Sequence, residues 1–261
     1  MFLERDVVAE ERHVRVDPRH AVNGRPTDAP QGGRYAVSKS FVERGLTLLL
    51  LVPALPVILA AALLVKLTSR GPIFYSQKRV GRNGRTYTLY KVRTMFHDCE
   101  RFTGPQWATV QDPRITLVGR WLRRVHIDEL PQFWNVLRGE MSLVGPRPER
   151  PEIAEHLERL IPAYQERLAM RPGLTGLAQV QLPADSDLAS VRIKLAHDLY
   201  YVQNVGLSLD LRILVCTGCY LLGIPFPFSN RLLKLPGGNR VEQAYEGAIA
   251  NGKVDLTMQV T

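Results

Sequence analysis

Two adjacent acids, Asp128 and Glu129, open the segment DELPQFWNVLR, which has Pro131 close behind them. Acids in the first turn with a nearby proline are typical of a helix start. Neighbouring carboxylates can also bind Mg²⁺ together with phosphate oxygens, and a carboxylate can attack phosphorus as a nucleophile. The structural alternative is that the acids only stabilise the helix dipole. The residue types thus predict either phosphate chemistry or a plain helix start.

Arginines surround these acids in the sequence. Arg123 and Arg124 precede Asp128, and Gly145-Pro146-Arg147-Pro148 places an arginine between two prolines. Prolines preset φ and reduce the entropy lost in holding a neighbouring side chain. A rigidly held guanidinium suits contact with phosphate. The chemistry is therefore predicted to lie between residues 119 and 150.

The composition of the chain limits the kinds of partner and site that can be expected. The chain has 261 residues, of which 45% are hydrophobic and 23% charged, which is enough for one large domain or two small ones. A net charge of +9 favours anionic partners such as nucleotides, phosphorylated metabolites or acidic lipids. Three cysteines exclude a disulfide scaffold, and the Cys216–Cys219 pair has no second pair to complete a zinc site.

Residues 46–65 carry no charge and are about long enough to cross a bilayer. Pro53 and Pro56 lie in the middle of this segment, where proline favours a kink. Basic residues flank it on both sides, and basic flanks tend to stay on the cytoplasmic side. We therefore expect a re-entrant helix that bends at the prolines and leaves by the face it entered. A spanning helix and a buried core helix are the alternatives.

The pattern along the chain predicts an α+β, mainly helical fold. It comprises a re-entrant membrane helix, amphipathic interfacial helices and a small β-hairpin around Asn83-Gly84. The expected parts are a polar leader at 1–38, the membrane helix at 39–72, a catalytic domain at 73–227 and a tail at 228–261. Within the catalytic domain, helices are expected at 113–124, 128–138, 151–168, 186–204 and 208–223, the last lying in the membrane interface.

The run HIDELPQFWNVLRGEMSLVGPRPE (126–149) resembles the signature of bacterial sugar transferases. These are the monotopic phosphoglycosyl transferases that begin lipid-linked glycan assembly. Other stretches are similar to further elements of this family in the same order: GPIFYSQKRVG, YKVRTM, DPRITLVGRWLRR, RPGLTGLAQV and DLYYVQN. The resemblance covers roughly residues 40–225.

The resemblance implies transfer of sugar-1-phosphate from a UDP-sugar to undecaprenyl phosphate or another polyprenyl phosphate, with release of UMP and with Mg²⁺ as cofactor. Asp128 would form a covalent aspartyl-phosphosugar intermediate, and Glu129 would bind the metal. An arginine counterion would keep Asp128 ionised. The residues expected to bind phosphate are Arg123, Arg147, Lys91, Arg93 and Arg171. A surface or lipid-facing role is the alternative for the last three.

Two positions depart from the family pattern. Val52 precedes Pro53, the expected break of the membrane helix, where the family often has Ser; His126 replaces a small Ser or Thr and is expected to serve in packing. The resemblance implies the bacterial inner membrane, with the catalytic domain on the cytoplasmic face. Anionic phospholipid is an expected partner, nucleic acid is not, and a homodimer is left open. The alternatives are an inactive membrane scaffold for glycan enzymes and a basic, membrane-tethered nucleic-acid binder.

Overall fold

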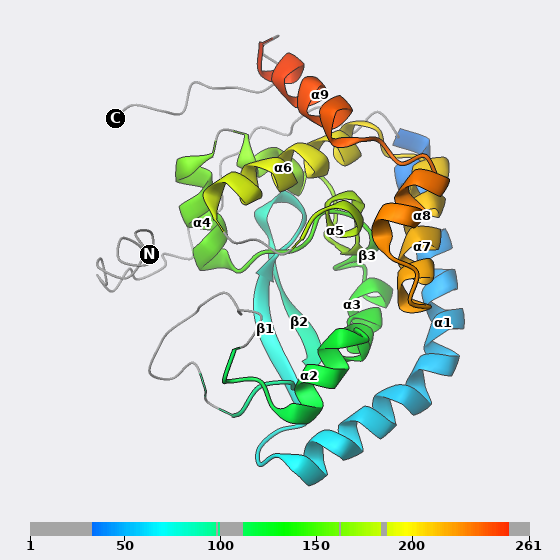
Figure 1. Ribbon diagram of the computed structural model, residues 1–261, viewed down its shortest axis with the longest axis vertical. Helices are drawn as coiled ribbons and strands as arrows, with labels where there is room; N and C mark the ends of the chain where they lie inside the picture. The colour runs from blue at the N-terminus through cyan, green and yellow to red at the C-terminus, as the bar shows by residue number, and fades with distance from the viewer. Residues whose placement is uncertain (1–32, 98, 100–111, 162, 184–186, 251–261) are drawn as a thin grey trace.

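A computed structural model describes residues 33–97, 99, 112–161, 163–183 and 187–250 (Figure 1). Most of the predicted leader, much of the stretch before residue 112 and the end of the tail lie outside these residues. The described chain is mainly helical with one β-hairpin and one short parallel strand pair, which confirms the α+β class. The hairpin lies in the middle of the molecule, with helices around it.

Helix α1 runs from Gly33 to Thr68 and begins before the predicted boundary at residue 39. It continues through Pro53 and Pro56, so the expected break at Pro53 is not a break in the helix. Proline removes one backbone donor, but its fixed φ is compatible with a bent helix, and α1 bends in its middle as it follows the edge of the molecule (Figure 1). Over Ser38–Thr68 the helix is long and apolar enough to cross a membrane. The re-entrant course stays a prediction.

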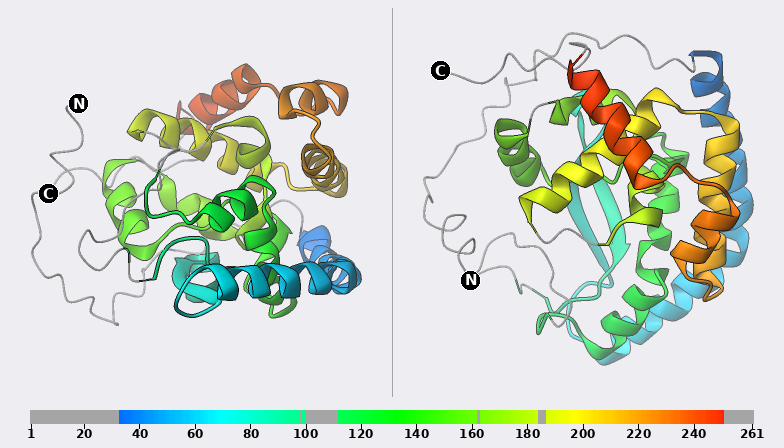
Figure 2. Two further views of the ribbon diagram at one scale, coloured as in Figure 1. Left: turned by 60° about the horizontal axis from the view of Figure 1, so that its bottom comes forward. Right: turned by 45° about the horizontal axis from the view of Figure 1, so that its top comes forward.

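One side of α1 packs against the rest of the molecule along most of its length, from Lys39 to Val65. Its other side exposes large apolar side chains. Helices α2 (Leu117–Arg124) and α7 (Leu207–Leu221) lie along the same edge and expose apolar side chains as well (Figures 1 and 2). We call these exposed residues the apolar band: Phe41, Val42, Leu48, Leu49, Val52, Leu55, Leu59, Leu63, Leu67, Leu117, Trp121, Leu207, Leu211 and Val215.

The predicted hairpin is confirmed. Strands β1 (Phe74–Val80) and β2 (Thr86–Val92) pair antiparallel, from Phe74 opposite Val92 to Val80 opposite Thr86. The connection is longer than a two-residue turn, since the short 3₁₀ helix η1 (Arg82–Gly84) lies between the strands. Asn83 and Gly84 both have positive φ, 55° and 74°, which these residue types tolerate best.

The segment that carries the acids is made of short helices. Helix α2 begins after Thr116, whose Oγ1 accepts a hydrogen bond from the Gly119 N–H at 2.9 Å, so it starts later than predicted. The predicted helix at 128–138 is divided into the 3₁₀ helix η2 (Ile127–Gln132) and α3 (Phe133–Leu137). Gly139, with φ +76°, ends this segment.

A short parallel pair then joins two distant parts of the chain. Strand β3 (Ser142–Val144) pairs with β4 (Gly173–Thr175). Between them lie α4 (Pro151–Leu160) and the 3₁₀ helix η3 (Tyr164–Ala169), so the helix predicted at 151–168 is divided in two. Helix α5 (Leu177–Gln181) follows β4.

The last four helices cover the hairpin and the strand pair. Helix α6 (Leu188–Gln203) is capped by Asp187, whose side chain accepts from the Ser190 N–H at 2.8 Å. Helix α7 is followed by α8 (Phe226–Leu232) and by α9 (Gly238–Ala250), which lies across α6 (Figure 2). The polar tail thus contributes a helix that its composition does not predict.

Candidate active site

The chain turns sharply just before the acid pair. His126 has φ 56°, in the left-handed region that a residue with a Cβ rarely adopts, and it links α2 to η2. Its ring packs against Tyr220 with centroids 5.7 Å apart, in agreement with the predicted packing role. A strained backbone conformation of this kind persists only where the surrounding structure enforces it. Here it turns Asp128 and Glu129 back toward the hairpin.

Glu129 lies between two cations from different elements. Its Oε1 accepts from Lys91 Nζ of β2 at 2.6 Å and from Arg147 Nη2 at 3.1 Å. Burial alone would raise the pKa of Glu129, but the charges of Lys91 and Arg147 outweigh it and hold the pKa well below its usual value. The Glu129 charge in turn raises the pKa of Arg147. Glu129 and Arg147 therefore both stay ionised at neutral pH.

Asp128 is in the opposite situation. Its side chain is buried, and its Oδ1 has no hydrogen-bond partner. Burial raises the pKa of Asp128 above its usual value, although Lys91 and Arg123 oppose the rise. Arg123 directs its Nε to Thr94 Oγ1, at 2.8 Å, and forms no hydrogen bond with Asp128, so it acts on this carboxyl through its charge. That an arginine keeps Asp128 ionised stays a prediction.

Arg147 is held through its backbone. Four consecutive carbonyl oxygens, those of residues 146–149, each accept a hydrogen bond from another segment, and β1 supplies two of the four donors. A residue with no Cβ is needed just before them, because a Cβ on Gly145 would lie 2.5 Å from the Arg171 carbonyl oxygen. The donors, in order, are Gly173 N at 2.8 Å, Arg167 Nη2 at 2.7 Å, Arg79 Nη1 at 3.1 Å and Val80 N at 2.9 Å.

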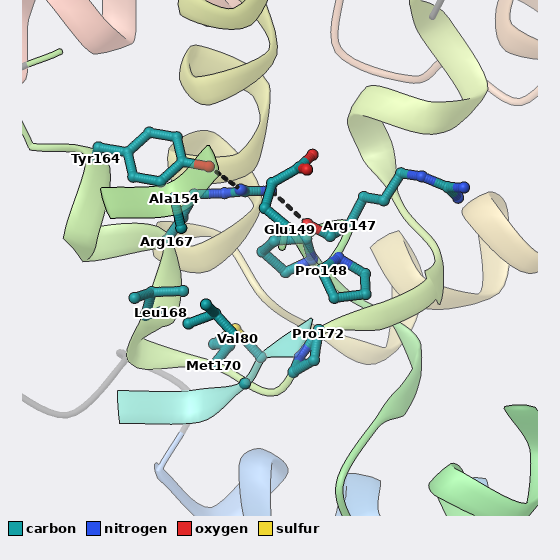
Figure 3. A pocket seen from close by; sticks show the side chains of 12 residues that line it. Val80, Arg147, Pro148, Glu149, Ala154, Tyr164, Arg167, Leu168, Met170 and Pro172 are labelled. Carbon is teal, nitrogen blue, oxygen red and sulfur yellow. Dashed lines mark hydrogen bonds between the residues drawn. The ribbon is translucent and has the colours of Figure 1, made fainter. Parts of the chain in front are cut away.

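Arg167 is the buried member of this set. Its Nε and Nη2 lie 2.9 and 2.7 Å from Asp198 Oδ2, and its Nη1 donates to the Tyr164 hydroxyl at 2.9 Å. Figure 3 shows Arg167 between Tyr164 and the backbone of Arg147, while the Arg147 side chain points away from this small pocket. Burial disfavours the cation, but Asp198 more than compensates and raises the pKa of Arg167. The pair thus fixes the backbone from which Arg147 reaches Glu129.

A model of the bacterial sugar transferase family matches residues 34–223, which is most of the chain. The chain belongs to the bacterial sugar transferase family. The matched range includes all of α1 except its first residue, the acid pair, the Pro-Arg-Pro segment and all of α7.

Curated relatives of this bacterial sugar transferase carry related names. It is 44% identical over 182 residues to a UDP-N-acetylgalactosamine-undecaprenyl-phosphate N-acetylgalactosaminephosphotransferase of Aeromonas hydrophila, a match that covers 68% of this chain and 43% of that protein. It is 38% identical over 204 residues to a UDP-glucose:undecaprenyl-phosphate glucose-1-phosphate transferase of Xanthomonas campestris pv. campestris, covering 77% of this chain and 42% of that protein. The chain thus spans less than half the length of these two relatives.

A shorter relative matches along most of its length. The exopolysaccharide production protein ExoY of Sinorhizobium fredii is 39% identical over 202 residues, covering 72% of this chain and 85% of that protein. The match to this relative thus covers most of a shorter protein.

Two other predicted phosphate-binding residues, Arg93 and Arg171, form their hydrogen bonds with residues outside the acid pair. The buried Arg93 donates from Nη2 to the Ser69 carbonyl and hydroxyl oxygens, at 2.9 and 2.7 Å, and so ties the end of α1 to β2. Arg171 donates to Ser40 Oγ near the start of α1. Of the predicted residues, the structure brings together Asp128, Glu129, Lys91 and Arg147, with Arg123 close enough to affect the pKa of Asp128.

Sequence reasoning missed the residues that hold Arg147 in place. Arg167 and Asp198 lie in stretches that resemble family elements or adjoin them, but neither was singled out. A signal was available, since Asp198 is a charged residue inside the otherwise mostly apolar run LAHDLYYV. Charged residues are almost never fully buried unless they are paired.

The acid pair can accept Mg²⁺. Carboxylate oxygens are hard ligands, and Asp128 Oδ1 is a buried acceptor with no partner in the protein. Among the described residues, no group of three His, Cys, Asp or Glu side chains could form a metal cage. Mg²⁺ typically uses one or two carboxylates and completes its shell with water and substrate phosphates, so the acid pair alone has the ligand types that it would need.

Proposed function

We propose that this transferase moves sugar-1-phosphate from a UDP-sugar to undecaprenyl phosphate, with Asp128 as the covalent nucleophile. The observation that carries the proposal is the contrast inside the acid pair. Glu129 is held by Lys91 and Arg147, whereas the neighbouring Asp128 offers a buried carboxylate oxygen with no partner. The names of the relatives support the two substrates.

In the first step, a carboxylate oxygen of Asp128 attacks the sugar-bearing phosphorus of the UDP-sugar. A P–O bond forms to Asp128, the bond from that phosphorus to the bridging oxygen breaks, and UMP leaves with the electron pair. In the second step, a phosphate oxygen of the lipid attacks the same phosphorus. The Asp128–phosphorus bond breaks, which regenerates the carboxylate and yields the lipid diphosphosugar.

The residues around Asp128 have distinct tasks. Lys91 and Arg147 offset the repulsion between the anionic nucleophile and the anionic pyrophosphate. Lys91 and Arg123 also favour the ionised form of Asp128, because both lower its pKa. Mg²⁺ bound at Asp128 and Glu129 would neutralise charge on the phosphate oxygens.

We place the reaction at the cytoplasmic face of the bacterial inner membrane. The apolar band supports membrane contact along one edge of the molecule. Basic residues at both ends of the apolar segment favour having both ends on the cytoplasmic side.

The test is UMP release by the detergent-purified protein over a panel of UDP-sugars with Mg²⁺, with and without undecaprenyl phosphate. We expect turnover to require the lipid and to favour one sugar. Without the lipid, intact-protein mass spectrometry should show one phosphosugar added, located at Asp128. If the folded protein releases no nucleotide from UDP-sugars or from other nucleotide sugars, the inactive membrane scaffold would be favoured. Turnover without any adduct would remove the covalent step.

A further inference from the structure

Three arginines from distant parts of the chain meet beside the start of the apolar face of α1. Arg82, at the hairpin tip, donates from Nε to the Ala169 carbonyl at 3.1 Å, two residues before Arg171. Arg171 donates to Ser40 on α1. Arg44 lies one helical turn after Ser40. Burial and the charges of Arg44 and Arg82 lower the pKa of Arg171, although Glu43 opposes the change, so both guanidinium groups lie close enough to repel that of Arg171.

No acid side chain neutralises this group within the described chain. None of the three arginines forms an ion pair there. The nearest acid on α1, Glu43, is already held by Lys39 at 2.8 Å, by the Val144 N–H at 3.2 Å and by Ser142 Oγ.

The second acid near this group is also engaged. Glu140 lies 3.2 Å from Arg138 Nε and accepts from Asn135 Nδ2 at 2.6 Å. The arginines therefore have charge that the protein does not compensate.

Arg44 provides an independent sign of a missing partner. Its Nε is buried and makes no hydrogen bond. Its Nη2 lies so close to Gly139 that a Cβ there would be 2.3 Å away. The guanidinium is thus confined between α1 and the end of α3 while one of its donors is unused. A buried donor without an acceptor costs free energy, which an anion at this place would recover.

This arginine group is separate from the acid pair. Ile127, next to Asp128, packs against the cluster that contains Ala61 of α1. Ala61 is 17 residues after Arg44, and so about 25 Å farther along the helix. A single phosphate cannot contact both places, so the acceptor phosphate attacked near Asp128 is not the anion that this group would hold.

The surroundings indicate a lipid as the source of the anion. Phe41 and Leu48, one turn to either side of Arg44, are 70% and 60% exposed and belong to the apolar band. Arginines at the edge of an apolar surface lie at the level of lipid headgroups, where they attract anionic lipid. We propose that Arg44, Arg82 and Arg171 bind the phosphate of an anionic membrane phospholipid, an inference that rests on the proposed membrane position of α1.

The test is native mass spectrometry of the full chain in mild detergent, with phosphatidylglycerol or phosphatidylcholine of the same acyl chains added. We expect one phosphatidylglycerol to be retained in preference to phosphatidylcholine. The double variant Arg44→Gln/Arg82→Gln should bind phosphatidylglycerol about 10- to 30-fold more weakly, from the contribution of each arginine near a lipid surface. Its retention of phosphatidylcholine should not change.

The matched control removes two exposed arginines from the other side of the hairpin. Arg159→Gln/Arg192→Gln, on α4 and α6, has the same net charge and should retain lipid like the wild type (Figure 1). Should the first double variant fail to fold, Arg82→Gln alone, at an exposed side chain, provides the measurement.

Equal retention of phosphatidylglycerol by wild type and variant would overturn the proposal. So would displacement of the retained lipid by undecaprenyl phosphate together with a raised KM for it in the variant, since the site would then belong to the acceptor. Lipid retention is measured without nucleotide sugar, so a failure of the proposed transfer reaction would not affect this result.

Discussion

Two groups of buried charges lie along α1, and they differ in how fully the protein satisfies them. Near the start of the helix, Lys39 Nζ contacts Glu43 at 2.8 Å and Asp210 at 2.5 Å. Asp210 also accepts from the hydroxyls of Tyr35 and Tyr201, each at 2.6 Å. Each of these carboxylates thus has several partners.

The acid pair, beside the second half of α1, is satisfied only in part. Glu129 has two cationic partners, but Asp128 Oδ1 has no hydrogen-bond partner. Burying a carboxylate without partners costs free energy, so such a group persists where a ligand or a reaction uses it. The difference indicates that the first group holds the fold together, and it agrees with the proposal that the second is left incomplete for a substrate.

The strongest test of this comparison is to replace one aspartate by asparagine in each group. Asp128→Asn removes the proposed nucleophile and should lower turnover by at least about 1,000-fold. It should also raise the melting temperature. Because burial raises the pKa of Asp128, the stability linked to this group is present at low pH and lost as pH rises through that pKa. Wild-type turnover, or a lower melting temperature, would contradict the comparison.

Asp210→Asn should do the reverse. It leaves Lys39 with one buried acid partner instead of two, and breaking a buried ion pair typically costs about 3–5 kcal/mol. We expect a clearly lower melting temperature, measured in the detergent used for purification. The turnover rate per folded molecule should change little. A variant as stable as the wild type would show that this charge group does not hold α1 in place.

A third test concerns the support of Arg147. Arg167→Lys keeps a charge beside Asp198 but cannot also reach the Tyr164 hydroxyl and the Arg147 carbonyl. Small displacements of positioning groups cost much of a rate, so kcat should fall about 10- to 100-fold while KM changes less. Tyr164→Phe, which removes a single hydrogen bond, serves as the matched variant with a smaller expected effect. A loss of stability with kcat per folded molecule unchanged would mean that Arg167 is structural only.

The smallest expected effect is a shift in pH dependence. Lys91 lowers the pKa of Asp128, so Lys91→Met should raise that pKa further. The acid limb of the kcat profile, where Asp128 loses its proton, should then move to higher pH. Lys78→Met, at an exposed lysine of β1, is the control and should leave the limb in place. If the acid limb of the kcat profile stays in place in Lys91→Met, Lys91 does not influence the ionisation of Asp128.

The sequence was sufficient for most of the local elements and for several residues that the structure brings together in the candidate site. The alternating pattern predicted both strands of the hairpin, and the acids, prolines and arginines of 119–150 pointed to Asp128, Glu129 and Arg147. These predictions depend on residues close together in the chain, where periodicity and turn chemistry decide the structure.

What the sequence could not supply are the contacts across long separations. The parallel pairing of β3 with β4 and the hydrogen bond from Arg167 to the Arg147 carbonyl join segments about 20 or 30 residues apart in the chain. The competition at Asp128 between burial, which raises the pKa, and nearby cations, which lower it, also depends on how deeply the side chain is packed. Burial is a property of the folded molecule and not of a motif.

The apolar band also determines how an encounter with a lipid substrate would take place. A molecule attached to a bilayer along the edge formed by α1, α2 and α7 searches for lipids within a plane. For the proposed acceptor, the quantity that sets the rate is then its mole fraction in the membrane, because confinement to a surface fixes the effective concentration. Adding neutral lipid to the bilayer slows such an enzyme even when the total amount of acceptor in the sample stays the same.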